Sequence, residues 1–534
     1  MAVPTLDAAS PQRTEPILVR RPQVGPLWRR ALLRAVLVPL TVLSPLVALA
    51  PTADHRFNIY WHGALFRDDP LRIVPHTLGS LPGYLRSGNF RPLGRMLEKA
   101  LDLTAYTLGD VFGVPANVAF RLVEFACAVL LSLLVLLFAE SVVARGPLFR
   151  RPPSTLAAVL PFAVGAGLVA AGRASPVVLF GGLYFASAAL VLAVAAAVCR
   201  IDTDRRIPVG WVPPLVVAGV ALAAFNEIAY FALPLATVAV AARGRLVLDL
   251  SWRRLLRGAP VRVLALLWSG FLPLFGAVRA VIQHFCAAGH CYRGSDVTLG
   301  PAVLAALPAR LAAWFPPLMW PVAVHGGSHR PWLGGVVMLL ALALFAALAV
   351  HAVRDLRRMS PVDRRSAAAL TAAAVALLVL GATLGALNAD VQQLVAGHHW
   401  GTAWRDTAVT GPAGALLIAA AGHLPPRRRW LLAALIALLA CGATVSAAAD
   451  KRFRDTVMGT AAARLDDRLA QAMTDFDPTP AGAARRCELR GEFFTMFRAA
   501  PFSLRRFDQA FDAAAEQRAG VPFCPHVTAR QPAR

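Results

Sequence analysis

The stretch Phe125-Ala-Cys-Ala-Val-Leu-Leu-Ser-Leu-Leu-Val-Leu-Leu-Phe-Ala139 holds one polar residue, a serine, in fifteen. With the residues before it, this stretch is long enough for an α-helix to cross a bilayer core of about 30 Å. Similar runs recur along the 534 residues, of which 57% are hydrophobic, and the mean hydropathy is +0.57. A soluble protein of this length exposes far more polar surface. The sequence therefore predicts an all-α integral membrane protein.

The apolar runs predict about eleven transmembrane helices. They cover Ala35–Pro51, Asn117–Ala139, Thr155–Gly172, Val177–Val198, Pro208–Phe225, Ile228–Ala242, Val263–Ile282, Trp332–Val350, Ser366–Leu387, Thr407–His423 and Trp430–Ala447. With the N-terminus inside, six inner segments hold 26 arginines and three short outer loops hold two. Positive residues concentrate on the cytoplasmic side. We therefore expect a cytoplasmic segment over 1–34, a transmembrane domain over 35–447 and an outer tail over 448–534.

The net charge of +24 is carried almost wholly by arginine, since Lys99 and Lys451 are the only lysines. In a membrane protein this charge serves mainly as a topology signal. No basic face alternates with exposed aromatic residues, which argues against nucleic acid as a partner. The composition, rich in Arg, Ala, Leu, Val and Pro, is typical of a high-GC bacterial genome. The predicted location is a bacterial cytoplasmic membrane, in which the chain is multi-pass and has no cleavable signal peptide.

Three outer regions interrupt the spans: residues 52–116, 283–331 and 388–406. The first is polar and is expected to carry short amphipathic helices. Within the second, residues 301–324 are apolar but contain Arg310 and five prolines. One more span there would move the arginine-rich loops to the outside, so we predict a re-entrant or interfacial segment.

Four cysteines fall in predicted outer regions. Pairs on the oxidising face predict the disulfides Cys286–Cys291 and Cys487–Cys524. The alternative for the first pair is a metal site, because His284 and His290 lie beside it. No second ligand pair at a typical zinc spacing follows, so the disulfide is favoured.

The first outer loop contains the strongest candidates for chemistry. Asp68 and Asp69 are adjacent carboxylates, and Arg91 and Arg95 follow within the element Arg-Pro-Leu-Gly-Arg. A carboxylate can deprotonate an acceptor hydroxyl, two can hold a divalent cation such as Mg²⁺ or Mn²⁺, and arginines can bind phosphate. Arg72 is a further candidate for substrate binding. The alternative is structural, because Asp-Asp-Pro is also an ordinary helix-start signal.

This arrangement resembles the O-antigen glucosyltransferase group of the GT-C superfamily of polytopic membrane glycosyltransferases. The resemblance rests on a transmembrane helix, an outer Asp-Asp, about twenty residues, Gly88-Asn-Phe-Arg-Pro-Leu-Gly94, and a further helix. It covers about residues 35–140, and it departs from the group's pattern at Phe90. It implies a polyprenyl-phosphate sugar donor, a glycan or lipid acceptor, and Asp68 or Asp69 as the general base.

Other outer residues could line the same site. Glu227 lies at the tip of a predicted hairpin. If it lies at membrane depth it is a functional candidate, because ionisable groups there are costly; the alternative is that it lies at the interface and is merely solvated. Arg121 and Glu124 are expected to pair with each other. The remaining candidates for substrate binding are Arg173, His398, His399 and Arg405. His325 and His329 are candidates for a lid over the site.

The tail begins with a predicted amphipathic helix over 452–473, followed by a small disulfide-stapled unit. This unit either caps the outer face or touches lipid headgroups or an acidic glycan.

The leading hypothesis is a transferase that moves sugar from a lipid-phosphate carrier, with the acids, arginines and outer loops converging on one cavity. The alternatives are a flippase or transporter of lipid-linked glycans, a glycan polymerase or ligase, and a non-catalytic assembly partner. A transporter would need polar groups near the bilayer midplane, and few charges fall in mid-helix. No nucleotide-binding signature is present, so a nucleotide sugar or ATP is not expected.

Overall fold

The computed structural model describes residues 24–51, 54–287, 289, 291, 297–325, 332–424 and 429–525. These residues fold into helices and loops, with two isolated β-bridges and no strand among them. The predicted His290 and His329 lie outside the described residues. The expected all-α class is confirmed for the part of the chain that the structure describes.

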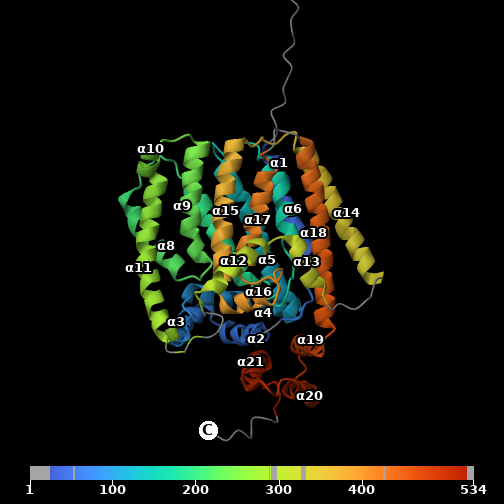
Figure 1. The fold of residues 1–534 in the computed structure, drawn as a ribbon. Coiled ribbons are helices and arrows are strands. Elements are labelled where there is room, and N and C mark those ends of the chain that lie inside the picture. Colours follow the sequence, from blue (N-terminus) through green and yellow to red (C-terminus); the bar gives the residue numbers. More distant parts are fainter. Residues whose placement is uncertain are drawn as a thin grey trace, which may run out of the picture.

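A bundle of long helices forms the body of the molecule (Figure 1). Its members are α1 (Val24–Leu43), α5 (Ala116–Val143), α6 (Leu156–Ala166), α7 (Gly181–Cys199), α8 (Val212–Ala223), α9 (Ala232–Ala242), α11 (Ala259–Ala287), α14 (Trp332–Asp355), α15 (Arg364–Ala386), α17 (Thr407–Ala421) and α18 (Arg429–Met458). Within the described residues, seven helical segments are long and apolar enough to cross a membrane. Each of the eleven predicted spans overlaps one helix of this bundle.

Shorter helices complete the chain. They are η1 (Ser44–Leu46), α2 (His55–Phe66), η2 (Pro70–Arg72), α3 (Ile73–Arg86), α4 (Pro92–Phe112), η3 (Val209–Trp211), η4 (Ala229–Phe231), η5 (Arg243–Val247), α10 (Trp252–Arg257), α12 (Pro301–Ala312), α13 (Pro316–Val324), α16 (Ala389–Ala396), α19 (Ala461–Thr474), α20 (Pro480–Met496) and α21 (Pro501–Ala519). Helices α2, α3, α4 and α19–α21 lie at one end of the bundle, and α10 lies at the other (Figure 1).

Apolar side chains and close helix crossings hold the bundle together. Helix α5 packs against α7, α4 and α1 around a continuous apolar core. Helices α8 and α11 approach most closely at Gly219 and Gly270. A Cβ atom on either glycine would lie 2.0 Å from a backbone oxygen of the other helix. Small residues at such crossings let helix backbones meet closely.

The chain between α6 and α7 is irregular, where the sequence predicted helix up to Gly172 and again from Val177. Its buried backbone groups have partners elsewhere: the Asp450 carboxylate accepts the Ala170 N–H at 2.7 Å, and the Ala403 N–H donates to the Ala171 oxygen at 2.8 Å. Non-helical backbone inside a membrane protein requires such partners. The predicted spans are therefore wrong over this segment, because a carboxylate from α18 replaces helical hydrogen bonds.

Helices α12 and α13 meet at a bend of 94°. This geometry belongs to a broken span or a re-entrant loop, which are the arrangements that proline-rich apolar sequence favours. The Arg310 side chain ties the pair to the chain before α17, as described below.

The C-terminal helices differ from the predicted tail. Helix α18 continues to Met458, beyond the predicted end at Ala447, and α19 begins at Ala461. The residues over 452–473 are helical as predicted, but in two helices rather than one, since Thr460 interrupts them and caps α19 by accepting the Ala463 N–H at 3.3 Å.

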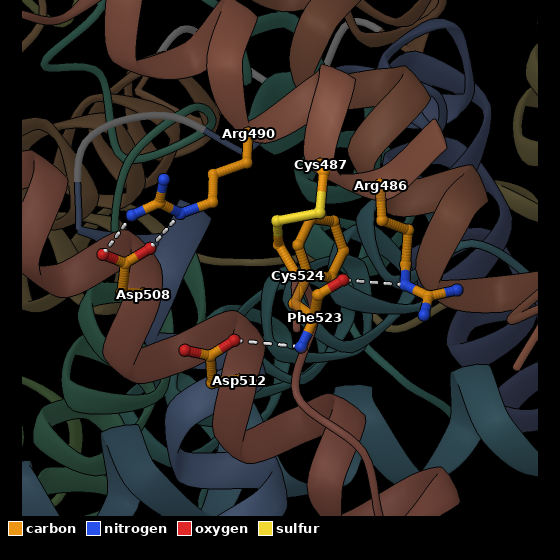
Figure 2. Close-up of a disulfide and its surroundings, with 7 residues drawn as sticks. All are labelled: Arg486, Cys487, Arg490, Asp508, Asp512, Phe523 and Cys524. Carbon is orange, nitrogen blue, oxygen red and sulfur yellow. Dashed lines mark hydrogen bonds and ion pairs between the residues drawn. A yellow bond between two sulfur atoms is a disulfide. The ribbon is translucent and has the colours of Figure 1, made fainter. Parts of the chain in front are cut away.

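Helices α19–α21 form a cap that packs on α2, α4 and α5 rather than standing free. Phe493, Phe507 and Phe511 share an apolar cluster with Phe57 of α2 and Tyr106 of α4. In Figure 2 the disulfide Cys487–Cys524 lies between two polar contacts that also fasten the cap. They are the Arg490–Asp508 ion pair at 2.7 Å and a hydrogen bond of 2.9 Å from Arg486 to the Phe523 oxygen.

Candidate functional site

A cavity of about 360 Å³ lies beside α3 and α4, at the end of the bundle that carries the cap. It brings together four parts of the chain: the end of α3 with the start of α4, the irregular segment before α7, the start of α2, and the loop before α17. Its walls are formed by Asp54, Tyr84, Ser87, Asn89, Arg91, Arg95, Ala174, Leu179, Phe180, Tyr184, Trp404 and Arg405.

The Arg-Pro-Leu-Gly element has a structural explanation. Pro92 occupies the first turn of α4, where its missing N–H costs nothing. The Leu93 and Gly94 N–H groups donate to the oxygens of Ala224 and Phe225, each at 3.1 Å. A Cβ atom on Gly94 would lie 2.5 Å from the Phe225 oxygen, so glycine permits this approach. The element therefore joins the start of α4 to the hairpin tip that carries Glu227.

Glu227 is half-buried and lies in the electrostatic field of three arginines. Burial alone would raise the pKa of its carboxyl group. The guanidinium groups of Arg405 and Arg91, with a smaller effect from Arg279, outweigh burial and hold that pKa below its ordinary value. The field of these arginines therefore favours the charged form of Glu227.

Two arginines of the cavity stack on aromatic rings. The Arg95 guanidinium lies 4.6 Å from the Tyr84 ring centre, and the Arg405 guanidinium lies 4.1 Å from that of Trp404. Arg95 also donates to Glu98 at 2.8 Å. Stacking on a ring fixes the plane of a guanidinium group. The cavity therefore combines fixed cationic groups with aromatic faces.

A buried ion pair positions the loop that carries Trp404 and Arg405. The Arg310 guanidinium of α12 meets the Asp406 carboxylate through two hydrogen bonds of 2.8 and 2.5 Å, and it donates a third, of 2.9 Å, to the Thr402 oxygen. The two side chains are 1% and 0% exposed. The bent helix pair thereby fixes one wall of the cavity.

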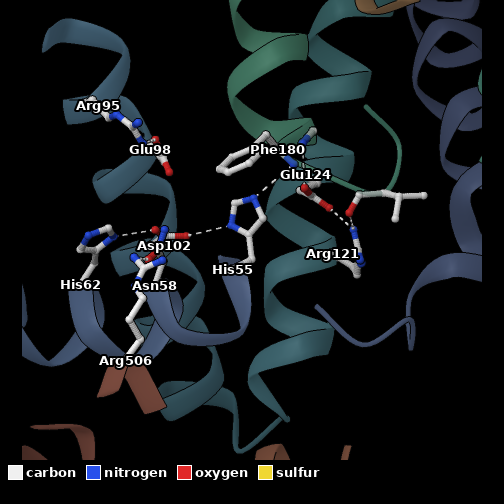
Figure 3. A network of polar contacts seen from close by, with 12 residues as sticks. His55, Asn58, His62, Arg95, Glu98, Asp102, Arg121, Glu124, Phe180 and Arg506 are labelled. Atoms are coloured by element: carbon white, nitrogen blue, oxygen red, sulfur yellow. Dashed lines mark hydrogen bonds and ion pairs between the residues drawn. The ribbon is translucent and has the colours of Figure 1, made fainter. Parts of the chain in front are cut away.

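A second polar network supports the opposite wall. Figure 3 shows His62 and His55 on either side of Asp102. The His62 Nδ1 lies 2.7 Å from one Asp102 oxygen, and the His55 Nδ1 lies 3.7 Å from the other. Burial would raise the pKa of Asp102, but the interactions with the two histidines outweigh burial and lower it. The His55 Nε2 accepts the N–H of Phe180 at 3.2 Å, so this network reaches a residue that lines the cavity.

Arg121 and Glu124 pair at 2.5 Å, as the sequence predicted. Glu124 also accepts the Gly181 N–H at 2.9 Å, which satisfies a free donor at the start of α7. Three backbone oxygens, of Leu49, Ala50 and Val178, accept further hydrogen bonds from Arg121. The pair therefore has a structural role beneath the cavity.

The structure brings Arg91, Arg95 and Arg405 into the cavity wall and places Glu227 beside it, but it does not bring the paired acids there. Asp68 and Asp69 are exposed, and Asp69 accepts the Leu71 N–H at 3.1 Å to cap η2. The expectation that these acids share one cavity with the arginines is wrong, because Asp-Asp-Pro acts as a helix-start signal.

The other candidates outside the cavity wall are Arg72, Arg173, His398 and His399, all of which are exposed. Among the described residues, no group of three or more His, Cys, Asp or Glu side chains gathers to hold a metal ion.

The disulfide Cys286–Cys291 supports the turn before Arg91. Gly88 in that turn has a φ of +78°, and a Cβ atom on it would lie 2.5 Å from the Cys291 Sγ. Trp404 lies in the loop over 388–406, which the sequence already predicted to bind sugar, but sequence reasoning missed the contribution of Tyr84 to the cavity. The one signal for Tyr84 was an aromatic residue two positions before an arginine.

None of the protein-family models, curated proteins and solved structures that were compared with this chain matches it.

Proposed function

We propose that this protein is a membrane glycosyltransferase that moves a sugar from a polyprenyl-phosphate carrier to a cell-envelope glycan or lipid acceptor. In the proposed topology eleven helices cross the bacterial cytoplasmic membrane, the N-terminus is inside, and the cavity opens on the outer face. Helices α12 and α13 form a re-entrant segment on that face. The observation that carries the proposal is the cavity that Arg91 and Arg405 line together with Tyr84 and Trp404. The backbone hydrogen bonds of Leu93 and Gly94 hold the hairpin tip that carries Glu227 against the start of α4.

The reaction assigns one role to each type of group. Glu227 accepts the proton of an acceptor hydroxyl while the hydroxyl oxygen bonds to the anomeric carbon of the sugar. The bond from that carbon to the phosphate oxygen breaks, and its electron pair stays on the phosphate. Arg91 and Arg405 stabilise the leaving phosphate. Tyr84 and Trp404 offer aromatic faces to the sugar ring.

The arginines also couple donor binding to the strength of the base. In the free protein they lower the pKa of Glu227. A bound lipid phosphate would neutralise much of their charge and so raise the affinity of Glu227 for a proton. The carboxylate would become a better base once the donor is in place.

The test compares Glu227→Gln with Asp68→Asn and Asp69→Asn in the native host. Glu227→Gln should lower formation of the glycan product about 10²–10⁴-fold, which is the usual contribution of a general base. Glu227→Asp, which keeps the carboxylate, should retain part of the activity. Cell-envelope glycans are analysed at matched levels of full-length protein in the membrane.

The two exposed acids serve as matched controls, because they remove the same charge at a distance from the cavity. Their variants should make normal glycans. A normal glycan profile in Glu227→Gln at normal protein level would end the assignment of Glu227 as the base. Loss of product in the control variants alone would return the role to the first outer loop.

A further inference from the structure

A second cavity, of about 420 Å³, is lined in part by residues of α10. Helix α10 lies at the end of the bundle away from α3 and α4 (Figure 1). The cavity is formed between the chain after α7 and the segment from α10 to the start of α11. Its lining is strongly basic, and it consists of Thr203, Asp204, Ser251, Arg253, Arg254, Arg257, Gly258 and Arg262.

The backbone around this cavity is held in place by local hydrogen bonds. The Ala259 N–H donates to the Thr203 oxygen at 3.0 Å and thereby joins the two walls. The Ser251 hydroxyl caps α10 by accepting the Arg254 N–H at 3.3 Å. A Cβ atom on Gly258 would lie 2.8 Å from the Thr203 side chain, so the walls are in close contact. The arginines therefore project from a fixed frame.

The charges in the cavity are not balanced by acids. Arg254 donates to Asp204 at 2.7 Å, and Arg262 donates to the Arg257 backbone oxygen at 2.9 and 3.2 Å. The guanidinium groups of Arg253 and Arg257 make no hydrogen bond or ion pair within the described residues. Four arginines against one aspartate leave a net charge of +3 in a single cavity.

Helix α10, which carries three of the lining arginines, also exposes apolar side chains. Trp252 and Leu256 are four residues apart on α10, and they are 57% and 61% exposed. Trp211, near the start of α8, is 58% exposed. Exposed tryptophan and leucine beside arginines are typical of the membrane interface, where rings and alkyl chains meet acyl chains and cations meet headgroups. A soluble phosphate compound would make no use of these apolar side chains.

We infer that the cavity lined by Arg253, Arg254, Arg257 and Arg262 is a binding site for the headgroup of an anionic glycerophospholipid. The phosphodiester would lie among the guanidinium groups, and the acyl chains would pass over Trp252 and Leu256. Basic pockets at helix ends recognise anionic headgroups in this way. The site is separate from the proposed transferase reaction and does not depend on it.

The test measures how strongly the full-length protein prefers one of two defined lipids. Protein purified in detergent is incubated with equal amounts of phosphatidylglycerol and phosphatidylcholine, and bound lipids are counted by native mass spectrometry. An arginine near an anionic lipid surface strengthens binding about fivefold. Arg253→Gln/Arg257→Gln should therefore lower the preference for phosphatidylglycerol about twenty-five-fold. Neither guanidinium has a partner in the fold, so the variant should fold normally.

The matched control is Arg205→Gln/Arg206→Gln, which removes two exposed arginines from the neighbouring loop but none from the cavity wall. It should keep the wild-type preference. An equal loss in both double variants would show general surface charge rather than a site, and would overturn the inference. So would displacement of the bound lipid by millimolar glycerol phosphate, because the ligand would then be a soluble phosphate.

Discussion

Replacing Arg310 by methionine should destabilise the protein by about 3–5 kcal/mol, which is the usual effect of leaving one partner of a buried ion pair uncompensated. The size follows from the geometry. Arg310 and Asp406 are 1% and 0% exposed, and three hydrogen bonds of 2.5 to 2.9 Å end at this guanidinium. Methionine keeps most of the volume of the arginine side chain. The lost stability therefore comes from the Asp406 charge left without its partner and not from lost packing.

The assay is reversible unfolding in mixed micelles, with Trp fluorescence as the signal. Arg468→Met is the matched control, because Arg468 also meets a carboxylate, that of Glu492, through two contacts but is half-exposed. Exposed pairs contribute about 0–1 kcal/mol, so the control should change little. The double variant Arg310→Met/Asp406→Leu should regain most of the lost stability, since an apolar pair can replace a buried ionic one.

Two results would refute this reasoning. One is an effect of Arg310→Met no larger than that of Arg468→Met. The other is a double variant as unstable as the single one, because the cost would then come from packing. If the reasoning holds, Arg310→Met should also lose glycan product at normal protein level, since the same pair holds the loop of Trp404.

Further predictions concern the cavity, its electrostatics and the cap. Gly94→Ala should separate α4 from the hairpin tip, because the new Cβ atom would lie 2.5 Å from the Phe225 backbone oxygen, and should lower product formation about a hundredfold. Gly83→Ala is the control: a Cβ atom there would meet open space, so the same glycan analysis should show a normal product level. Arg405→Gln should raise the pKa of Glu227, so the acid limb of the pH–activity profile should move to higher pH; an unmoved limb would contradict the assigned field. Cys524→Ser opens a loop with a sequence separation of 37 and should cost about 3–4 kcal/mol in the unfolding assay; an unchanged midpoint would show that packing alone fastens the cap.

The helices were predictable where apolar runs alone decide them. Each predicted span overlaps a helix, because an apolar segment of this length is most stable as a helix inside a membrane. The ends were less predictable. The irregular chain after α6 has its hydrogen bonds completed by Asp450, which lies 280 residues away from the Ala170 N–H that it accepts. Helix α18 runs past its apolar part because its polar turns have partners in the bundle: Arg454 donates to the Pro45 oxygen at 3.3 Å, and Asp450 accepts the Ala170 N–H at 2.7 Å.

Part of the candidate site was visible in the sequence as residue types. Arginines and acids in outer loops could be named one by one as binders of phosphate or proton acceptors. The sequence could not predict which of them belong to the site and which lie on the surface. A carboxylate that caps a helix and one that faces an arginine have the same sequence signature. Asp69 caps η2, whereas Glu227 lies beside Arg91 and Arg405.

The sequence by itself determined that this chain is helical and apolar enough for a membrane, and which of its loops carry charge. Hydrophobicity is a local property, and a run of twenty residues is enough to express it. Only the tertiary structure decided that Arg91, Glu227 and Arg405 belong to one site. Segments more than a hundred residues apart meet there through the close approach at Gly94 and the Arg310–Asp406 pair, and no local pattern encodes such contacts.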